Sequence, residues 1–266
     1  LITHRLPARN PFWGAAVIST VLLMFAVGPL LPLGIVLLWY LGFTKLAATL
    51  TALVVASMIM ASHSPRFCRF FLQAAGYFRK GVYLHFEPRT IDAVQKSPTM
   101  WCMHPHGTAI GFGFTLNGAV RFRANDEKRF IPPEFSNHFD STRMRQADGV
   151  QAPILFRLPL LRSLLLSFGC ATPATKQGMK GLLERKIDFG ILPGGMEEVA
   201  LYSRGRERVY LSSRKGFIKY ALQYGYLLLP AYSFGECDLY QSMTTGTSFR
   251  VKKKKNLGFI IPLFWG

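Results

Sequence analysis

The clearest candidates for chemistry are two histidines in the motif His104-Pro105-His106-Gly107. They directly follow a short apolar segment, residues 99–103, that is typical of a strand. Ligand sites of α/β proteins gather at the carboxyl ends of strands, and a histidine there can act as a general base near neutral pH. Pro105 restricts the turn, and Gly107 permits a ligand to approach the backbone closely. The alternative is a turn whose histidines only satisfy local hydrogen bonds.

The same two histidines raise the question of a metal site, because a His-x-His pair can supply two ligands. Metal hydrolases of the His-x-His-x-Asp-His type need further acidic or imidazole ligands close by. Here residues 108–111 are Thr-Ala-Ile-Gly, which offer none. We therefore expect no metal and no other cofactor, and keep a metal hydrolase as a rival. Cys102, just before the motif, is a weaker candidate for the nucleophile of an acyl-enzyme.

A second motif, Pro-Gly-Gly-Met-Glu-Glu at residues 193–198, also closes a strand-like segment. Gly194 and Gly195 allow a tight turn whose backbone N–H groups could face an anion or a developing oxyanion. The carboxylate of Glu198 could orient a histidine from the neighbouring strand and stabilise its protonated form. The alternative is a loop followed by the acidic first turn of a helix, where Asp and Glu are favoured.

Two cations, Arg214 and Lys215, stand at the start of a predicted helix. Positive charge at a helix N-terminus opposes the helix dipole, so these residues are expected to serve another purpose. Pairing with the phosphates of a ligand is one such purpose, and solvated surface charge is the alternative.

Strand-like and helix-like segments alternate after residue 62, which favours an α/β domain with a mostly parallel sheet. The predicted strands are residues 99–103, 188–192 and 226–234, and the predicted helices are residues 160–168, 176–186 and 215–224. Gly225 is placed to terminate the last of these helices.

The N-terminal part is apolar, with no charged residue between positions 10 and 44 or between 46 and 63. A single helix over the first run would extend about 50 Å, well beyond the roughly 30 Å hydrocarbon core of a bilayer. We therefore predict a transmembrane helical hairpin over residues 12–61 that reverses at 28–34, where Pro and Gly cluster, or at 42–45. Positive charge on both flanks places both ends on the cytosolic side. A buried hairpin of a soluble core is the alternative.

Composition agrees with a membrane protein: 50% of residues are hydrophobic, 17% are charged, and the net charge is +18. This combination favours contact with anionic lipid headgroups, and the long uncharged runs argue against nucleic acid as a partner. The four cysteines lack metal-ligand spacing and are expected to be buried free thiols of a reducing compartment. We divide the chain into a membrane hairpin (1–62) and a catalytic domain (63–266).

The order of the motifs resembles the type-2 diacylglycerol acyltransferase family, which includes monoacylglycerol and wax-ester acyltransferases. The matching residues are His-Pro-His-Gly, Pro-Gly-Gly-x-x-Glu, Arg-Lys-Gly-Phe and the segment Pro-Ala-Tyr-Ser-Phe-Gly-Glu at 230–236, and residues 153–183 match more loosely. The likeness covers roughly residues 66–266. Together the motifs are specific, whereas each alone is not.

This resemblance implies an endoplasmic reticulum membrane protein with a cytosol-facing site, also found at the lipid droplet surface. It implies transfer of an acyl group from acyl-CoA to diacylglycerol, with monoacylglycerol and long-chain alcohol as alternative acceptors. It gives His106 the role of base, Glu198 that of its partner, and His104 a place beside them. The His-x4-Asp pattern of related enzymes is missing, since the residue after the four positions that follow His106 is Gly111 and not an aspartate.

Family members continue beyond residue 266, so the catalytic domain is expected to be truncated at its C-terminus. Pro105, Gly107, Gly194, Gly195, Arg214 and Lys215 are the expected substrate-binding residues. The expected partners are acyl-CoA, a neutral glycerolipid and membrane lipid, and a homo-oligomer is left open. The rival from another class is a non-enzymatic membrane scaffold whose basic face binds anionic lipid.

Overall fold

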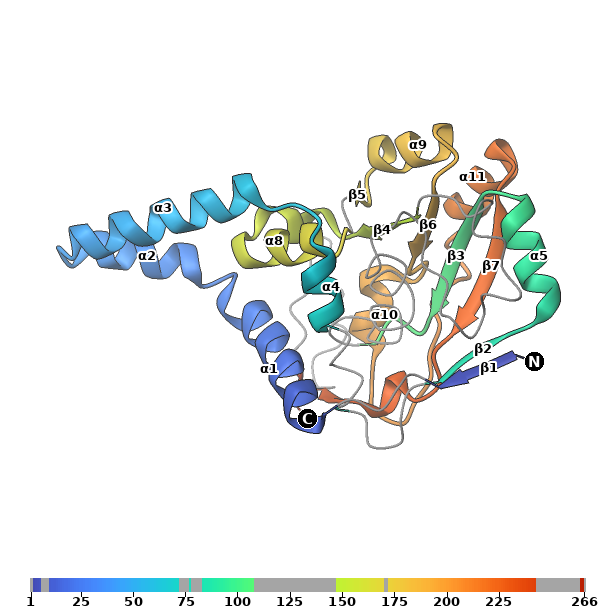
Figure 1. Cartoon of the computed structure of the whole chain (residues 1–266), viewed down its shortest axis with the longest axis horizontal. Coiled ribbons are helices and arrows are strands. Elements are labelled where there is room, and N and C mark those ends of the chain that lie inside the picture. The colour runs from blue at the N-terminus through green and yellow to red at the C-terminus, as the bar shows by residue number, and fades with distance from the viewer. Residues whose placement is uncertain are drawn as a thin grey trace.

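A five-stranded parallel sheet, in the order β5-β4-β6-β3-β7, forms the centre of the structure (Figure 1). The structure is a computed structural model that describes residues 2–5, 10–71, 77, 83–107, 147–169, 172–242 and 264–265. The strands of the sheet are β3 (Thr99–His104), β4 (Ala147–Gln151), β5 (Thr172–Pro173), β6 (Asp188–Ile191) and β7 (Leu227–Tyr232). The prediction of an α/β domain with a mostly parallel sheet is confirmed.

The three predicted strands correspond to β3, β6 and β7, which are neighbours in the sheet. All residues of β6 are buried, as expected for a strand covered on both faces. At its start, Asp188 is buried and its Oδ1 accepts a hydrogen bond of 2.8 Å from the backbone N–H of Thr99. This contact fixes β3 beside β6 at the end of the sheet opposite the predicted site.

The predicted helices are also present, as α8 (Pro159–Ser167), α9 (Lys176–Glu184) and α11 (Gly216–Tyr224). The hydroxyl of Thr175 caps α9 by accepting from the N–H of Gly178 at 3.1 Å. Gly225 ends α11 in the left-handed conformation with φ of 63°, as predicted. The helix with an acidic first turn that the sequence offered after the Pro-Gly-Gly turn is present as α10 (Gly195–Leu201), with Glu197 and Glu198 in its first turn. Helices without a sequence prediction are α4 (Pro65–Phe71), α5 (Pro88–Lys96), and the 3₁₀ helices η5 (Pro153–Arg157) and η6 (Glu236–Asp238).

Helices α9 and α11 pack against the sheet and close its apolar core. Leu182 and Leu183 of α9 and Ala221 of α11 are buried against side chains of β3, β4 and β6. The hydroxyl of Tyr226 donates to the carbonyl oxygens of Leu182 and Ile187, which ties the end of α9 to the start of β7. By contrast, Leu222 of α11 is 79% exposed.

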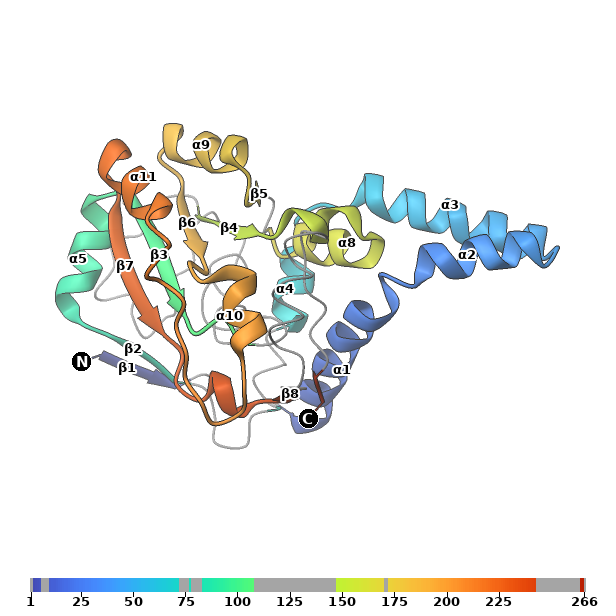
Figure 2. The same ribbon diagram turned by 180° about the vertical axis from the view of Figure 1, so that it is seen from behind.

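The N-terminal apolar segment forms three helices, α1 (Pro11–Val27), α2 (Leu31–Tyr40) and α3 (Thr44–Met60). The chain bends by 55° between α1 and α2 and reverses between α2 and α3, which run side by side away from the sheet (Figures 1 and 2). The reversal thus lies at residues 41–43, where Gly42 has φ of 83°, rather than at the Pro/Gly cluster. The structure confirms a helical hairpin there.

The first of these helices belongs to a second apolar cluster, which it shares with α4 and α8. Val17, Ile18 and Val21 of α1 are buried there together with Phe71 of α4 and Leu161 of α8.

Further contacts join α3 and the N-terminal strand to the rest of the chain. Arg162 Nε and Ser163 Oγ donate to carbonyl oxygens of α3 at 3.2 and 3.0 Å. Strand β1 (Ile2–Arg5) pairs with β2 (Tyr83–Phe86) in an antiparallel ribbon. Contacts therefore cross the predicted domain boundary at residues 62 and 63.

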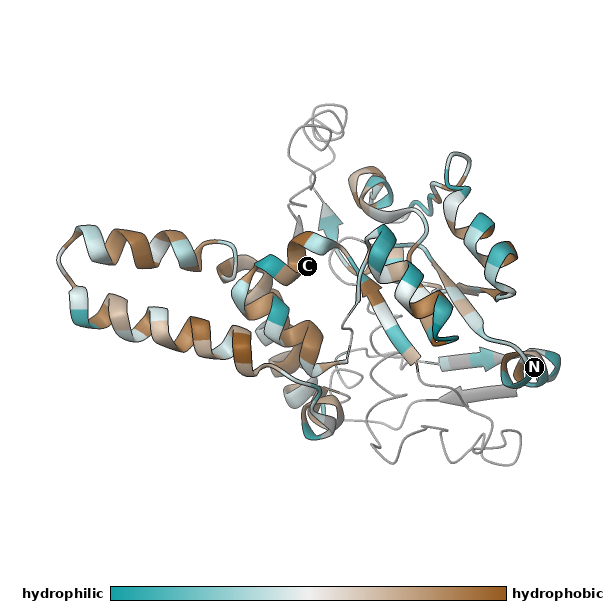
Figure 3. Ribbon diagram, turned by 90° about the horizontal axis from the view of Figure 1, so that it is seen from above, coloured by the Kyte–Doolittle hydropathy of each residue, from teal (hydrophilic) through white to brown (hydrophobic). Residues whose placement is uncertain are grey.

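Helices α2 and α3 are rich in hydrophobic residues (Figure 3), and several of these side chains are exposed. Leu33, Val36 and Leu37 are 67%, 65% and 54% exposed, and Ile59 and Met60 are 77% and 78% exposed. Among the described helices none is by itself both long and apolar enough for a bilayer, whereas the bent pair α1–α2 meets both conditions when taken together.

Several sequence predictions fall partly outside the described residues. Cys68, Cys102 and Cys237 are buried free thiols, as expected, while Cys170 lies outside. The four lysines at 252–255 and most of the C-terminal segment also lie outside, apart from β9 (Phe264–Trp265), which pairs with β8 (Gln241–Ser242).

Leu183 provides a test of the sheet core. Leu183 is fully buried, so Leu183→Ala should lower the free energy of unfolding by about 2–5 kcal/mol. Leu222→Ala on the neighbouring helix is the matched control and should change it by less than about 0.5 kcal/mol, because its side chain is 79% exposed. Thermal unfolding in detergent followed by circular dichroism measures both, and equal losses would contradict this packing.

Candidate active site

The candidate site is built at the carboxyl end of β3, between its neighbours β6 and β7. His104 is the last residue of β3 and lies in register with Tyr232, the last residue of β7. Its carbonyl oxygen accepts a hydrogen bond of 2.7 Å from the N–H of Ser233, which fixes the strand end. The peptide bond from His104 to Pro105 is cis. The chain then turns through His106 and Gly107.

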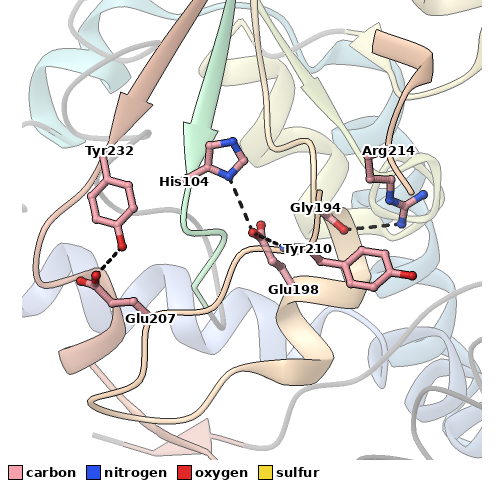
Figure 4. Close-up of polar contacts among 7 residues, drawn as sticks. All are labelled: His104, Gly194, Glu198, Glu207, Tyr210, Arg214 and Tyr232. Carbon is pink, nitrogen blue, oxygen red and sulfur yellow. Dashed lines mark hydrogen bonds and ion pairs between the residues drawn. The ribbon is translucent and has the colours of Figure 1, made fainter. Parts of the chain in front are cut away.

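Glu198 reaches this strand end from α10, the helix that follows β6 after the Pro-Gly-Gly turn. Its side chain is buried, and its Oε1 lies 3.6 Å from Nδ1 of His104 (Figure 4). The same oxygen accepts a hydrogen bond of 3.1 Å from the backbone N–H of Tyr210. The two predicted motifs therefore meet in space, and the carboxylate faces the imidazole of His104.

His106 lies in the turn beyond the strand and is partly buried. Burial lowers the pKa of His106, and the negative charge of Glu198 and backbone hydrogen bonds oppose this shift. A lowered pKa keeps the imidazole neutral near pH 7, which a proton acceptor requires. Glu198 thus acts on His106 through its charge, whereas its direct contact is with His104. The sequence prediction had paired Glu198 with His106.

Buried polar atoms without a hydrogen-bond partner are concentrated in this region. Among the described residues they include Nδ1 of His104, Nδ1 of His106 and Oε2 of Glu198. Such atoms are rare in folded proteins and call for an explanation in each case. Their gathering at one strand end is typical of a site whose groups exchange protons or bind a substrate.

Three of the predicted glycines have clear local roles. A Cβ on Gly194 would overlap the carboxylate of Glu198, so only glycine leaves room for this side chain. Gly107 has φ of 69°, and a Cβ there would lie 2.7 Å from Oε1 of the buried Glu236. Gly195 has φ of 58°, and its N–H donates to the carbonyl of Leu192 at 3.0 Å. This N–H is therefore engaged in the turn, and an oxyanion role of the backbone N–H groups at Gly194 and Gly195 stays a prediction.

Arg214 lies beside this turn and is already paired. It forms an ion pair with Glu197, its Nη2 lies 3.5 Å from the carbonyl oxygen of Gly194, and its guanidinium lies over the ring of Tyr210 at 5.5 Å. Lys215 precedes α11 and is exposed. Binding of phosphates by these two cations stays a prediction.

Residues 203–215, which connect α10 to α11 and which we call the strap, supply contacts that the sequence did not indicate. Tyr210 donates its N–H to Glu198, and Glu207 accepts a hydrogen bond of 2.5 Å from the hydroxyl of Tyr232 (Figure 4). Glu207 and Tyr210 belong to no recognised motif, and Tyr232 and Glu236 appear only within the segment 230–236. For Tyr232 and Glu236, the sequence signal was their position within this segment of the resemblance.

Two observations concern the alternative chemistries, which are an acyl-enzyme at Cys102 and a metal site. Burial raises the pKa of Cys102 to about 12, and its Sγ lies 3.7 Å from the carbonyl oxygen of Met100, so the thiol stays protonated. A protonated thiol is a poor nucleophile, which disfavours an acyl-enzyme at Cys102. No group of three or more potential metal-ligating side chains occurs in the part of the chain that the structure describes.

Comparison with known proteins places these features in a family. The family model described as "Diacylglycerol acyltransferase" matches residues 131–266, half of the chain, which include the Pro-Gly-Gly turn, Glu198 and the strap. Diacylglycerol O-acyltransferase 2 of Dictyostelium discoideum is 32% identical over 178 residues, which cover 64% of this chain and 49% of that protein. No solved structure matches significantly.

Two further relatives carry related names. Diacylglycerol O-acyltransferase 1 of Eremothecium gossypii is 39% identical over 116 residues, which cover 41% of this chain and 25% of that protein. 2-acylglycerol O-acyltransferase 1 of Bos taurus is 29% identical over 196 residues, which cover 71% of this chain and 54% of that protein. The chain thus spans between a quarter and about half of the length of these relatives. Because the family model matches half of the chain, and because the motif resemblance agrees with it, the chain belongs to the diacylglycerol acyltransferase family.

Proposed function

We propose that this protein is an acyl-CoA-dependent O-acyltransferase that esterifies diacylglycerol at a membrane. The observation that carries the proposal is the meeting of His104, His106 and Glu198 at the ends of β3 and β6, where buried polar atoms have no hydrogen-bond partner among the described residues. Membership of the diacylglycerol acyltransferase family supports the same reaction.

In the proposed reaction His106 is the general base. It takes the proton of the acceptor hydroxyl as that oxygen attacks the thioester carbonyl carbon of acyl-CoA. The tetrahedral intermediate then collapses, the carbon–sulfur bond breaks, and the leaving thiolate takes the proton back from the imidazolium. The negative charge of Glu198 stabilises the imidazolium of His106. The contact between Glu198 and His104 holds the imidazole ring of His104 in place. The scheme uses no metal or other cofactor.

Diacylglycerol is the proposed acceptor, and monoacylglycerol and long-chain alcohol are the alternatives. The relatives in Dictyostelium discoideum and Eremothecium gossypii are named for diacylglycerol, and the relative in Bos taurus for 2-acylglycerol. Arg214 and Lys215 are proposed to contact the phosphates of coenzyme A. For Arg214 this requires exchange of its ion pair with Glu197 for a phosphate.

We further propose that α2 and α3 insert into the endoplasmic reticulum membrane, and that the protein also reaches lipid droplets. The exposed leucines of α2 support this, since exposed apolar side chains that gather on one element mark a site of membrane or protein contact. Both substrates carry long aliphatic chains and partition into lipid, so a membrane anchor brings the site to them. A non-enzymatic scaffold would use the same anchor without any acyl transfer.

The proposed base can be tested in microsomes from a host without its own neutral-lipid synthesis. Labelled acyl-CoA is offered with diacylglycerol, monoacylglycerol or fatty alcohol in parallel. His106→Ala should reduce product formation by about 10²–10⁴-fold, because a general base contributes that much. A loss below about tenfold would refute the assignment of the base. Absence of product from membrane-inserted wild-type protein would favour the scaffold.

The pH dependence of kcat/KM tests the electrostatics. The pKa of His106 is lowered, so the acidic limb of the wild-type profile should lie below pH 6.5, the ordinary value for histidine. Glu198 raises this pKa by its charge, so Glu198→Gln should move the limb to still lower pH and reduce kcat. A limb that moves upward or stays fixed in Glu198→Gln would show that Glu198 does not act on the titrating group.

The membrane anchor is tested by charge substitution in α2. Leu33→Arg combined with Leu37→Arg should release the protein from carbonate-washed microsomes, since each arginine at the centre of a membrane helix costs about 2.5–3.5 kcal/mol. Leu222→Arg, at a position that is 79% exposed on α11, is the matched control and should stay bound. Equal retention of both variants would contradict insertion of α2.

A further inference from the structure

A second polar pair lies beside His104, on the side away from Glu198. The hydroxyl of Tyr232 donates to Oε2 of Glu207 at 2.5 Å, and Figure 4 shows the two side chains meeting across from the Glu198 contact. Tyr232 is in register with His104 on the adjacent strand. Residues in register project to the same face of a sheet, so Tyr232 lies beside His104 and the pair borders the candidate site.

The pair is accessible from solvent and has an apolar neighbour. Tyr232 is 41% exposed and Glu207 is exposed. Phe234 is 85% exposed, and its ring centroid lies 4.9 Å from that of Tyr232. The rim of the site therefore combines one carboxylate, one phenol and two accessible aromatic faces.

The charge state of the pair limits what it can bind. Burial, the hydrogen bond to Glu207 and the charge of Glu207 raise the pKa of Tyr232 to about 12, so the phenol stays neutral and the pair carries a single negative charge. A negative carboxylate repels phosphates, which disfavours coenzyme A or a phospholipid headgroup at this position. The carboxylate of Glu207 accepts hydrogen bonds from hydroxyl groups, and the rings of Tyr232 and Phe234 favour contact with the aliphatic part or the glycerol carbons of a lipid. A neutral polyol attached to an aliphatic chain fits both properties.

We propose that Tyr232 and Glu207 form a subsite for the second free hydroxyl of a monoacylglycerol acceptor, separate from the hydroxyl that is acylated. This inference rests on the proposed function and concerns its alternative acceptor monoacylglycerol, because the one free hydroxyl of diacylglycerol is the hydroxyl that is acylated. It predicts that the protein also binds monoacylglycerol, whose second free hydroxyl fills the subsite, in preference to a long-chain alcohol, which has none.

Binding can be measured without turnover. The whole protein, purified in detergent, is titrated with radiolabelled 1-O-hexadecylglycerol, a two-hydroxyl ether, and with labelled 1-hexadecanol as the reference within each variant. We expect the wild type to bind the glycerol ether more tightly than the alcohol. Glu207→Gln and Tyr232→Phe should each reduce that ratio of affinities about tenfold, the effect of one hydrogen bond to a charged group.

Glu184→Gln is the matched control, because Glu184 is an exposed carboxylate on α9 that pairs only with a solvent-exposed lysine in the described contacts. Its affinity ratio should equal that of the wild type. Thermal unfolding identifies a variant that fails to fold, and Tyr232→Phe, which removes a single oxygen, then carries the test. The inference is overturned if the wild type shows no preference for the ether, or if both ligands weaken equally in both variants, which would mean that the pair only holds the strap against β7.

Failure of this inference and failure of the proposed function are distinguishable. A wild-type protein that prefers the ether and loses the preference in both variants, yet transfers no acyl group, supports the subsite and refutes the enzyme. In an active protein, the KM for monoacylglycerol should rise about tenfold in Glu207→Gln relative to that for hexadecanol. An unchanged KM ratio would refute the subsite while leaving the acyltransferase intact.

Discussion

Burial of the Glu198 carboxylate is the constraint on which the arrangement of the site depends. Removing a carboxylate from water costs several kcal/mol unless other groups compensate for the lost hydration. Here the N–H of Tyr210 and the imidazole of His104 approach the same oxygen, at 3.1 and 3.6 Å. The absence of a side chain at Gly194 provides the space that the carboxylate occupies. The turn, the strap and the end of β3 are therefore fixed relative to one another by one buried charge.

The order of strands explains why the strap takes part at all. In the sheet, β3 lies between β6 and β7, so the connection that leaves β6 and returns as β7 must pass β3. That connection consists of α10, the strap and α11. The strap contacts Glu198 on the β6 side and Tyr232 on the β7 side, so it spans the strand end that carries His104. A parallel sheet with this order places Glu207 and Tyr210 of the strap near the histidines, although neither residue belongs to a motif.

The sequence allowed prediction of those features that have local causes. Three strands, three helices, the Gly225 cap and the hairpin follow from apolar runs and from residues with restricted backbones. Strands β4 and β5 were missed, because Ala147–Gln151 is not an apolar run and β5 has two residues.

Side-chain pairing was predicted less well than the elements, because it depends on distances across the sheet. Both motifs were expected to meet, and they do, yet the carboxylate contacts His104 and not His106. Glu207 and Tyr210 could not be found, since a loop without periodicity gives no indication of what its side chains or amides contact. Likewise, nothing in the sequence indicated that the N–H of Gly195 closes the local turn on Leu192.

The division of charge on α10 links this packing to the chemistry. Glu197 and Glu198 are adjacent, and two unpaired carboxylates beside the histidines would both raise the pKa of His106. Arg214 forms an ion pair with Glu197 and lies over the ring of Tyr210, the residue whose amide binds Glu198. One carboxylate is thus neutralised, and the other supplies a single negative charge to the histidines. Burial then outweighs that charge in setting the pKa of His106, so the ring stays neutral before the reaction and gains a counter-charge once it is protonated.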